Sequence, residues 1–109
     1  MANLKKIIKF TSSVWRDNEI KTVESQNLVP GDLIILGSGE RIPADGSLVE
    51  GSNLFVNEAI LTGEEEAVPK IPGGKKNKLF MGTIVYSGRG QMRAEKIGLE
   101  TEIGKIGKS

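Results

Sequence analysis

The chain has 109 residues, of which 38% are hydrophobic, and its 15 basic and 14 acidic side chains leave a net charge of +1. This length and composition predict one domain, residues 1–109, with a single hydrophobic core. A net charge near zero disfavours nucleic acid as a partner, and the absence of Cys and His excludes disulfides, thiolate catalysis, Ser-His pairs and the usual zinc sites. Any chemistry must therefore use carboxylates, hydroxyls, amines or the backbone.

The N-terminal residues 1–12 are predicted to be a linker with a short amphipathic helix over residues 3–10. Leu4, Ile7 and Ile8 fall at helical spacing among lysines. The longest strictly aliphatic run of the chain, residues 33–36, is much shorter than the roughly 20 residues of a membrane helix. We therefore expect a soluble chain.

Residues 13–100 are expected to form a β core, because turn signals rich in Gly, Pro and Asp separate short apolar runs. This pattern is typical of a small barrel, sandwich or jelly roll and not of βαβ units. The predicted strands cover residues 13–16, 19–23, 33–36, 47–49, 54–56, 79–86 and 91–97. The predicted turns cover residues 17–18, 30–32, 37–39, 45–46, 51–53, 72–74 and 88–90.

The last residues, 101–109, are predicted to be a linker that begins with a short helical segment. Thr101 is a suitable N-terminal cap for such a segment. Gly104 and Gly107 are poor helix formers and argue against a long helix.

The most unusual local pattern is the run Thr62-Gly63-Glu64-Glu65-Glu66. Composition alone favours an exposed acidic turn. The run also suits a hydrolytic loop, because Gly63 permits close approach to a ligand, Thr62 supplies a hydroxyl and Glu64 can accept a proton from water. A phosphoryl group would repel Glu64 by about 1 kcal/mol at 4 Å in water, so metal or basic groups must offset it. No obvious set of these occurs in the chain, which implies that they belong to another domain or molecule.

Other candidate residues are better explained by structure. The glycine clusters at 37–39 and 87–90 match neither a Walker loop nor a dinucleotide fingerprint, so turns are the better interpretation. Asp32 and Asp45 adjoin turn glycines, and we expect each to bond local backbone. The aromatic side chains do not alternate with basic residues as on a base-stacking surface, so we expect most of them in the core. They are Trp15, Phe55, Phe80 and Tyr86.

Five segments, in order and at compatible spacings over roughly residues 13–107, resemble the actuator domain of P-type ATPases. They are Leu28-Val29-Pro30-Gly31-Asp32, Ile42-Pro43-Ala44-Asp45-Gly46, Val56-Asn57-Glu58-Ala59-Ile60-Leu61-Thr62-Gly63-Glu64, Leu79-Phe80-Met81-Gly82-Thr83 and Thr101-Glu102-Ile103-Gly104-Lys105-Ile106. The resemblance is strongest toward the branch of calcium, proton and related cation pumps. It does not specify the transported cation, because transmembrane residues select it.

The resemblance implies a distorted jelly-roll β domain, similar to a double-stranded β-helix, with short helical segments at its termini. It implies a place on the cytosolic face of a membrane, between two transmembrane helices of a pump. The implied partners are those helices and the phosphorylation and nucleotide-binding domains of the same pump. ATP and Mg²⁺ are implied only for the full-length pump, with no cofactor in this domain. We expect the isolated chain to be monomeric and inactive.

The resemblance also implies roles for three residues of the acidic run. Glu64 would position and activate the water that hydrolyses an aspartyl phosphate on the phosphorylation domain. Gly63 would permit close approach to that phosphate, and Thr62 would shape the loop. At the next position the family usually has Ser, whereas this chain has Glu65, which adds a negative charge. Asp45 would belong to the framework of the domain.

Two other functions stay open from the residues alone. The first is a stand-alone β-barrel interaction module whose acidic turn, residues 64–66, binds a basic partner or a divalent cation. Consecutive carboxylates do not converge easily on a cation, and the sequence has no regularly spaced calcium loop. The second is a small soluble phosphatase, for which the sequence lacks a nucleophile constellation.

Overall fold

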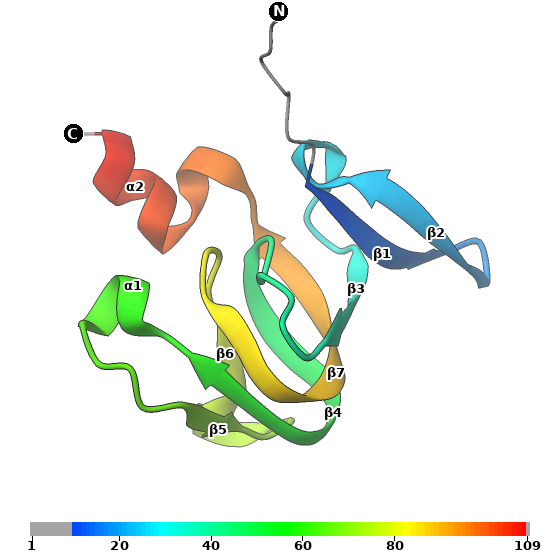
Figure 1. The fold of residues 1–109 in the computed structure, drawn as a ribbon. Helices are drawn as coiled ribbons and strands as arrows, with labels where there is room; N and C mark the ends of the chain where they lie inside the picture. The colour runs from blue at the N-terminus through cyan, green and yellow to red at the C-terminus, as the bar shows by residue number, and fades with distance from the viewer. Residues whose placement is uncertain (1–9, 109) are drawn as a thin grey trace, which may run out of the picture.

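The computed structural model describes residues 10–108, and the predicted helix over residues 3–10 falls almost wholly outside them. The prediction of a mainly β, jelly-roll-like fold with short helices is confirmed (Figure 1). Its strands are β1 (Thr11–Arg16), β2 (Glu19–Glu24), β3 (Leu33–Gly37), β4 (Asp45–Asn57), β5 (Val68–Lys70), β6 (Lys78–Leu79) and β7 (Ile84–Lys96). The helices are α1 (Ala59–Thr62) and α2 (Glu102–Lys108), with 3₁₀ turns η1 (Ser25–Asn27), η2 (Gly74–Asn77) and η3 (Gly98–Glu100). No helix within residues 10–108 is long and apolar enough to cross a membrane.

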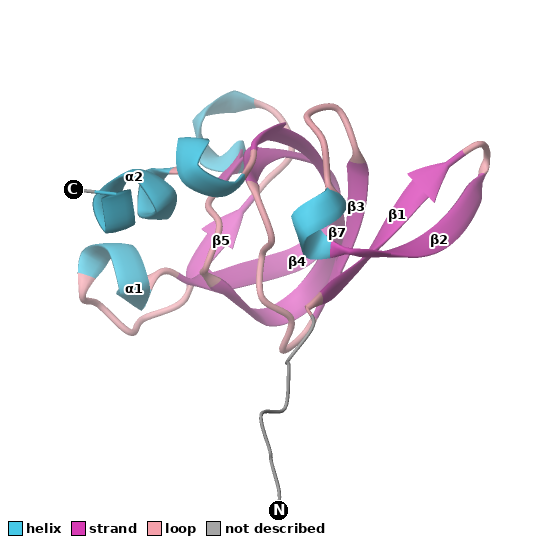
Figure 2. Cartoon of the chain, turned by 90° about the horizontal axis from the view of Figure 1, so that it is seen from above, coloured by secondary structure: helices cyan, strands magenta, loops and turns pink. Residues whose placement is uncertain are grey.

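The strands form one antiparallel sheet in the order β2-β1-β3-β7-β4-β5, and β6 pairs with the beginning of β4. β4 and β7 each have 13 residues and pair from Asp45 opposite Lys96 to Asn57 opposite Ile84. Several shifts of register interrupt this pairing, and such bulges bend strands and increase their twist. The sheet consequently curls around the core. The β1–β2 hairpin projects from one end of the molecule, and α1 and α2 lie at the other (Figure 2).

The core fills the inner side of the curled sheet. Leu54 and Val56 of β4 are buried whereas Phe55 between them is exposed, as expected from the alternation of side chains along a strand. The buried hydrophobic residues form one cluster, and burial of each large aliphatic side chain contributes about 1.5–3 kcal/mol. The cluster comprises Val14, Leu28, Ile34, Leu36, Ile42, Ala44, Leu48, Leu54, Val56, Leu79, Val85, Met92 and Ala94.

The expectation that most aromatic side chains lie in the core is wrong. Tyr86 is 70% exposed, Trp15 is 40% exposed and Phe55 is 37% exposed. Because Val14 and Val85 occupy inward positions, the residues that follow them point outward. The parity of each strand, which tertiary pairing sets, therefore outweighs the hydrophobicity of the individual ring.

Three of the predicted turns are wrong, because they lie inside the two long strands. They are residues 45–46, 51–53 and 88–90. A Cβ atom on Gly46 would lie 2.0 Å from the carbonyl oxygen of Arg93, and one on Gly88 would lie 2.0 Å from that of Asn53. These glycines therefore mark close approach of the two paired backbones and not chain reversal.

The predicted strand over residues 79–86 is interrupted by a turn. β6 ends at Leu79, and β7 begins at Ile84. The backbone N–H and the hydroxyl of Thr83 both donate to the carbonyl oxygen of Phe80, at 3.3 and 2.7 Å. The buried Thr83 hydroxyl thus stabilises a tight turn within an apolar stretch for which the sequence pattern predicted one continuous strand.

The first three strands agree with the prediction. Asp17-Asn18 joins β1 to β2 with φ angles of 55° and 63°, as in a two-residue hairpin turn. Arg16 donates to both carboxylate oxygens of Asp32, at 3.1 and 2.7 Å. Asp32 also accepts from the backbone N–H of Val29 at 3.0 Å, which confirms the local bond expected of it. The unpredicted ion pair fastens the projecting hairpin to the loop before β3.

Asp45 bonds backbone, but not the local backbone expected of it. Its Oδ1 accepts from the N–H of Met81 and its Oδ2 accepts from the N–H of Glu102, both at 2.8 Å. The residue is 7% exposed, and both donors are distant in sequence. Asp45 therefore joins the turn after β6 to the first residue of α2.

Thr101 caps α2 as predicted, since its Oγ1 accepts from the N–H of Gly104 at 3.0 Å. Gly104 does not end the helix, which continues to Lys108. A Cβ atom on Gly104 would lie 2.2 Å from the carbonyl oxygen of Gly98. Glycine at this position therefore lets α2 pack closely against η3.

We predict that Asp32→Asn lowers the free energy of unfolding at pH 7 by about 1.5–3 kcal/mol, the usual contribution of hydrogen bonds to a charged group. The hydrogen bonds from Arg16 lower the pKa of Asp32 in the folded chain. The stabilisation from ionised Asp32 is therefore complete above the unfolded pKa of about 4 and disappears as the pH falls through the lower folded pKa.

Urea unfolding of both proteins from pH 7 to pH 2 measures this effect. The stability difference between wild type and Asp32→Asn should shrink at acid pH. The matched control is Asp17→Asn, because Asp17 has a side chain that is 84% exposed in its ion pair with Lys21. If wild type and Asp32→Asn differ in stability as much at pH 2 as at pH 7, the stabilisation does not come from ionised Asp32.

Candidate functional site

The candidate site is the exposed segment that follows β4, at the end of the molecule where α1 and α2 lie (Figure 1). β4 ends at Asn57, whose Oδ1 accepts from the N–H of Ala59 at 2.8 Å. This bond satisfies one of the N–H groups that a helix leaves free at its start. α1 then makes a single turn that the sequence did not predict. Ile60 of α1 and Ile103 of α2 both border the space beside Gly82, so the two helices are neighbours.

Gly63 ends α1 in the left-handed region, with a φ of 80°, and donates its N–H to the carbonyl oxygen of Ala59 at 2.8 Å. Glycine adopts this conformation without the penalty that a Cβ atom brings. A Cβ atom on Gly63 would meet no other atom within 4 Å. The backbone conformation and not packing therefore requires glycine here, and the open space leaves the backbone accessible to another molecule.

Thr62 connects the helix to the next residue of the loop. Its Oγ1 donates to the carbonyl oxygen of Glu58 at 3.2 Å and accepts from the N–H of Glu64 at 3.1 Å. The Glu64 side chain is exposed and has no hydrogen bond or ion pair with any other residue in the described range 10–108. The structure thus places Thr62, Gly63 and Glu64 in one turn with the carboxylate in solvent.

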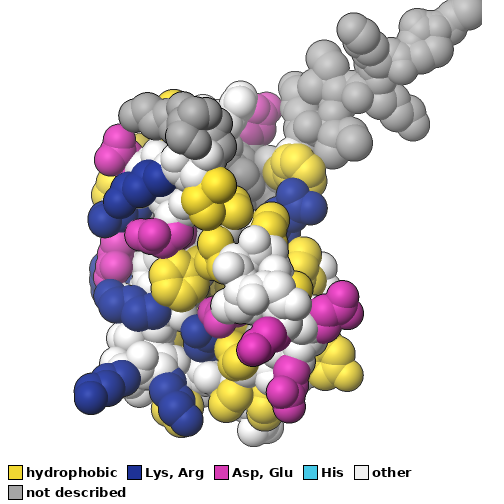
Figure 3. Space-filling view, turned by 90° about the vertical axis from the view of Figure 1, so that its left-hand side faces the viewer, with side chains coloured by type: hydrophobic (Ala, Val, Ile, Leu, Met, Phe, Trp, Pro, Cys, Tyr) yellow, Lys and Arg dark blue, Asp and Glu magenta, His cyan; other side chains and the backbone are white. Residues whose placement is uncertain are grey.

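Glu65 and Glu66 continue the exposed loop. The carbonyl oxygen of Glu65 accepts a long hydrogen bond, 3.4 Å, from the side chain of Asn57. Within the part of the chain that the structure describes, no three acidic side chains are grouped as metal ligands. Figure 3 views this end of the molecule, where several acidic side chains gather near one edge and most Lys and Arg side chains near the opposite edge.

Two residues at the base of the loop were missed by the sequence analysis. Lys70 Nζ lies 2.8 Å from Glu58 Oε2, and the two side chains are only 10% and 14% exposed. The contact is an ion pair without hydrogen-bond alignment. Lys70 Nζ also lies 5.7 Å from the centre of the Phe80 ring. The available signal was a lysine at the end of the short segment Val68-Pro69-Lys70. The sequence could not reveal that Glu58 is its partner, because this contact depends on the pairing of β5 with β4.

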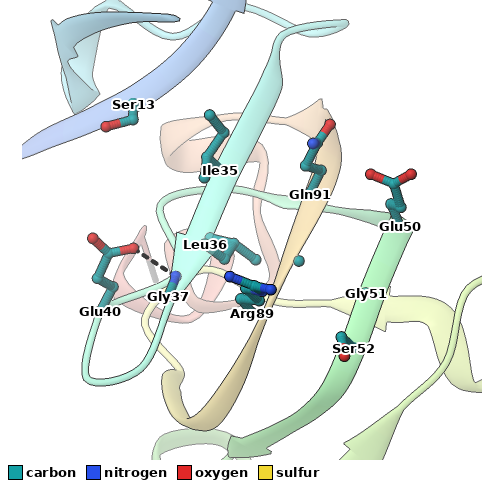
Figure 4. Close-up of a pocket in the computed structure, with 11 residues that line it drawn as sticks. Ser13, Ile35, Leu36, Gly37, Glu40, Glu50, Gly51, Ser52, Arg89 and Gln91 are labelled. Atoms are coloured by element: carbon teal, nitrogen blue, oxygen red, sulfur yellow. Dashed lines mark hydrogen bonds between the residues drawn. The ribbon is translucent and has the colours of Figure 1, made fainter.

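The two other glycine clusters border a shallow pocket of about 470 Å³ on the outer face of β3, β4 and β7 (Figure 4). None of residues 62–66 lines it. Gly37 pairs with Arg89 across β3 and β7, and its N–H donates to the Glu40 carboxylate at 2.8 Å. Because this N–H is occupied, the turn at residues 37–39 is not a phosphate cradle.

The arrangement can act chemically on something outside this domain. An exposed carboxylate can accept a proton from water, provided that the water is held against its target. The nearest charged neighbours in sequence, Glu65 and Glu66, are negative and would repel a phosphoryl group instead of binding it. The loop therefore contains a potential general base but not the groups that offset the charge of a phosphorylated substrate.

Comparison with known proteins identifies the family. The model of the P-type ATPase actuator domain matches residues 6–109. A calcium-transporting ATPase of Listeria monocytogenes is 42% identical over 104 residues, which cover 87% of this chain and 12% of that protein. Calcium-transporting ATPase 1 of Bacillus cereus is 40% identical over 94% of this chain and 13% of its own length. The copper-exporting P-type ATPase B of Archaeoglobus fulgidus is 39% identical over 97% of this chain and 15% of its own length.

Solved structures agree with these relatives. The crystal structure of a zinc-transporting PIB-type ATPase in the E2.Pi state superposes with a TM-score of 0.77 at 29% identity, covering 90% of this chain and 16% of that one. The chain thus spans roughly an eighth of the curated relatives named above. Their sequence similarity, the matching fold and the family model together show that the chain belongs to the actuator-domain family of P-type ATPases.

Proposed function

We propose that this domain promotes hydrolysis of an aspartyl phosphate carried by a separate phosphorylation domain of a P-type cation pump. The observation that carries the proposal is the exposed Glu64 carboxylate, which has no partner among residues 10–108 although its backbone is fixed by Thr62. A group that is held in position but left without an internal partner suits contact with another domain. The names of the relatives, which are calcium-transporting, cation-transporting and copper-exporting ATPases, are consistent with this class of pump.

In the proposed reaction, Glu64 orients a water molecule and accepts its proton as the water attacks phosphorus and the bond to the aspartate breaks. Gly63 lets the loop approach the phosphate without a side chain in between. Thr62 holds the backbone N–H of Glu64 and thereby sets the direction of the turn. The Mg²⁺ and basic groups of the phosphorylation domain would offset the phosphate charge, and the pump's nucleotide domain would supply ATP.

The loop differs from the usual family pattern at Glu65. Its side chain adds negative charge next to Glu64, whereas a Ser hydroxyl at that position is neutral. The carboxylate is exposed, so solvent screens it until the loop docks against a partner. Glu65 is therefore proposed to make docking more dependent on basic groups of the phosphorylation domain.

Hydrolysis and movement are proposed to be coupled through α2. Asp45 bonds the first N–H of this helix and the turn after β6, so α2 is joined to the body of the domain near α1. In an intact pump on the cytosolic face of a membrane, α2 would lead toward a transmembrane helix. Rotation of the domain as one body during docking would then pull on that connection.

We predict that Glu64→Ala in the full-length pump leaves phosphorylation from ATP intact and slows decay of the phosphoenzyme by about 100-fold to 10,000-fold, the usual contribution of a general base. Radioactive phosphoenzyme, chased with unlabelled ATP, measures the decay. Glu66→Ala is the matched control, because it removes an exposed carboxylate two residues away. Normal decay in Glu64→Ala would remove Glu64 from the mechanism.

We predict that the isolated 109-residue chain neither binds nor hydrolyses ATP, because the proposed reaction needs groups of another domain. Calorimetry with ATP and a phosphate-release assay measure the two activities. Stoichiometric ATP binding or turnover would defeat the proposal.

A titration with Ca²⁺ or Mg²⁺, followed by amide chemical shifts, tests the alternative of a cation-binding module. That alternative predicts tight, saturable shifts centred on residues 62–66.

A further inference from the structure

The segment that carries Glu64 has little packing of its own. α1 has four residues, none of them buried, and residues 62–66 are all exposed. A helix of one turn is unstable by itself, because nucleation fixes several residues for a single hydrogen bond. The position of the loop must therefore be determined at its base, where the chain leaves β4 and returns as β5.

The Glu58–Lys70 ion pair lies at this base. Glu58 directly precedes α1, and Lys70 is the last residue of β5, paired with Leu54 of β4. The 2.8 Å contact between the two side chains thus closes the segment at both ends. The same Glu58 supplies the carbonyl oxygen that accepts from the N–H and the hydroxyl of Thr62. Any shift of Glu58 is therefore transmitted to the backbone of the loop.

Both side chains of this pair are nearly buried, with Glu58 14% exposed and Lys70 10% exposed. In the Arg16–Asp32 pair only Asp32 is buried, at 8% exposed, and Arg16 is 35% exposed. Lys78 and Glu95 are 56% and 44% exposed at a distance of 3.5 Å. Loss of one member of a buried pair leaves an uncompensated charge, which must move toward water. Lys70 Nζ also lies within cation–π distance of the Phe80 ring, 5.7 Å from its centre.

We propose that Lys70 is a positioning residue, which holds the Thr62-Gly63-Glu64 turn in place through its nearly buried ion pair with Glu58. The proposal rests on the proposed function for its catalytic consequence, but its structural part concerns this chain alone. Without Lys70, the Glu58 carboxylate turns toward solvent and carries the start of α1 with it. Glu64 then loses its fixed direction although its own side chain is unchanged.

The first test is amide hydrogen exchange of the 109-residue chain, measured by NMR. In Lys70→Met, the amides of Leu61, Thr62 and Gly63, which bond to the carbonyls of residues 58 and 59, should exchange at least about tenfold faster. The amide of Ala94 in β7, which bonds to the carbonyl oxygen of Asp32 just before β3, should keep its wild-type rate. Lys78→Met is the matched control and should leave all of these rates unchanged.

Two further variants keep this test decisive if Lys70→Met unfolds. Glu58→Gln keeps the shape of the side chain and removes its charge, so it should accelerate exchange at the same three amides. The double variant Glu58→Lys/Lys70→Glu swaps the two charges and should restore slow amide hydrogen exchange. Unchanged exchange in a folded Lys70→Met would overturn the proposal, and so would a uniform acceleration that includes Ala94, because that result indicates general stability only.

The second test uses the full-length pump and separates this proposal from the proposed function. Lys70→Met should slow phosphoenzyme decay by about tenfold with normal phosphorylation from ATP, and Lys70→Arg should recover most of the rate. Normal decay in Lys70→Met together with slow decay in Glu64→Ala would overturn the positioning role only. Normal decay in Glu64→Ala would overturn the proposed function, and the exchange experiment would still decide the structural role of Lys70.

Discussion

The pairing of β4 with β7 is the constraint on which the rest of this structure depends. The two 13-residue strands run side by side from Asp45 to Asn57, and their inward side chains supply a large part of the core. This pairing requires glycine where the backbones approach most closely, as at Gly46 and Gly88. The bulges between these points curl the sheet, so one ribbon both encloses the core and ends at the candidate site.

The two ends of this ribbon serve different parts of the molecule. At the start of β4, the buried Asp45 bonds the N–H groups of Met81 and Glu102 and so fixes α2. At the end of β4, Asn57 bonds the N–H of Ala59 and starts α1. The same strand therefore places the loop of Glu64 and the C-terminal helix relative to one another.

Charge is distributed unequally between the base and the tip of the loop. At the base, Glu58 and Lys70 are nearly buried and neutralise one another. At the tip, Glu64 and its acidic neighbours are exposed and unmatched within residues 10–108. A charge-paired base and an unpaired tip are consistent with the proposed role, because a group that is positioned before it meets its partner loses less entropy on contact.

The sequence alone determined the family, the mainly β class, the Asp17-Asn18 turn and the Thr101 cap, because these depend on local patterns and ordered motifs. The roles of Thr62, Gly63 and Glu64 stay a prediction from the same motifs. It did not reveal that Gly88 lies within a strand, because glycine in a turn and glycine at a close backbone contact look the same in one dimension. Only the tertiary structure decided which rings face solvent and which carboxylates meet Arg16 and Lys70. Those outcomes follow from strand register, which joins residues far apart in the chain.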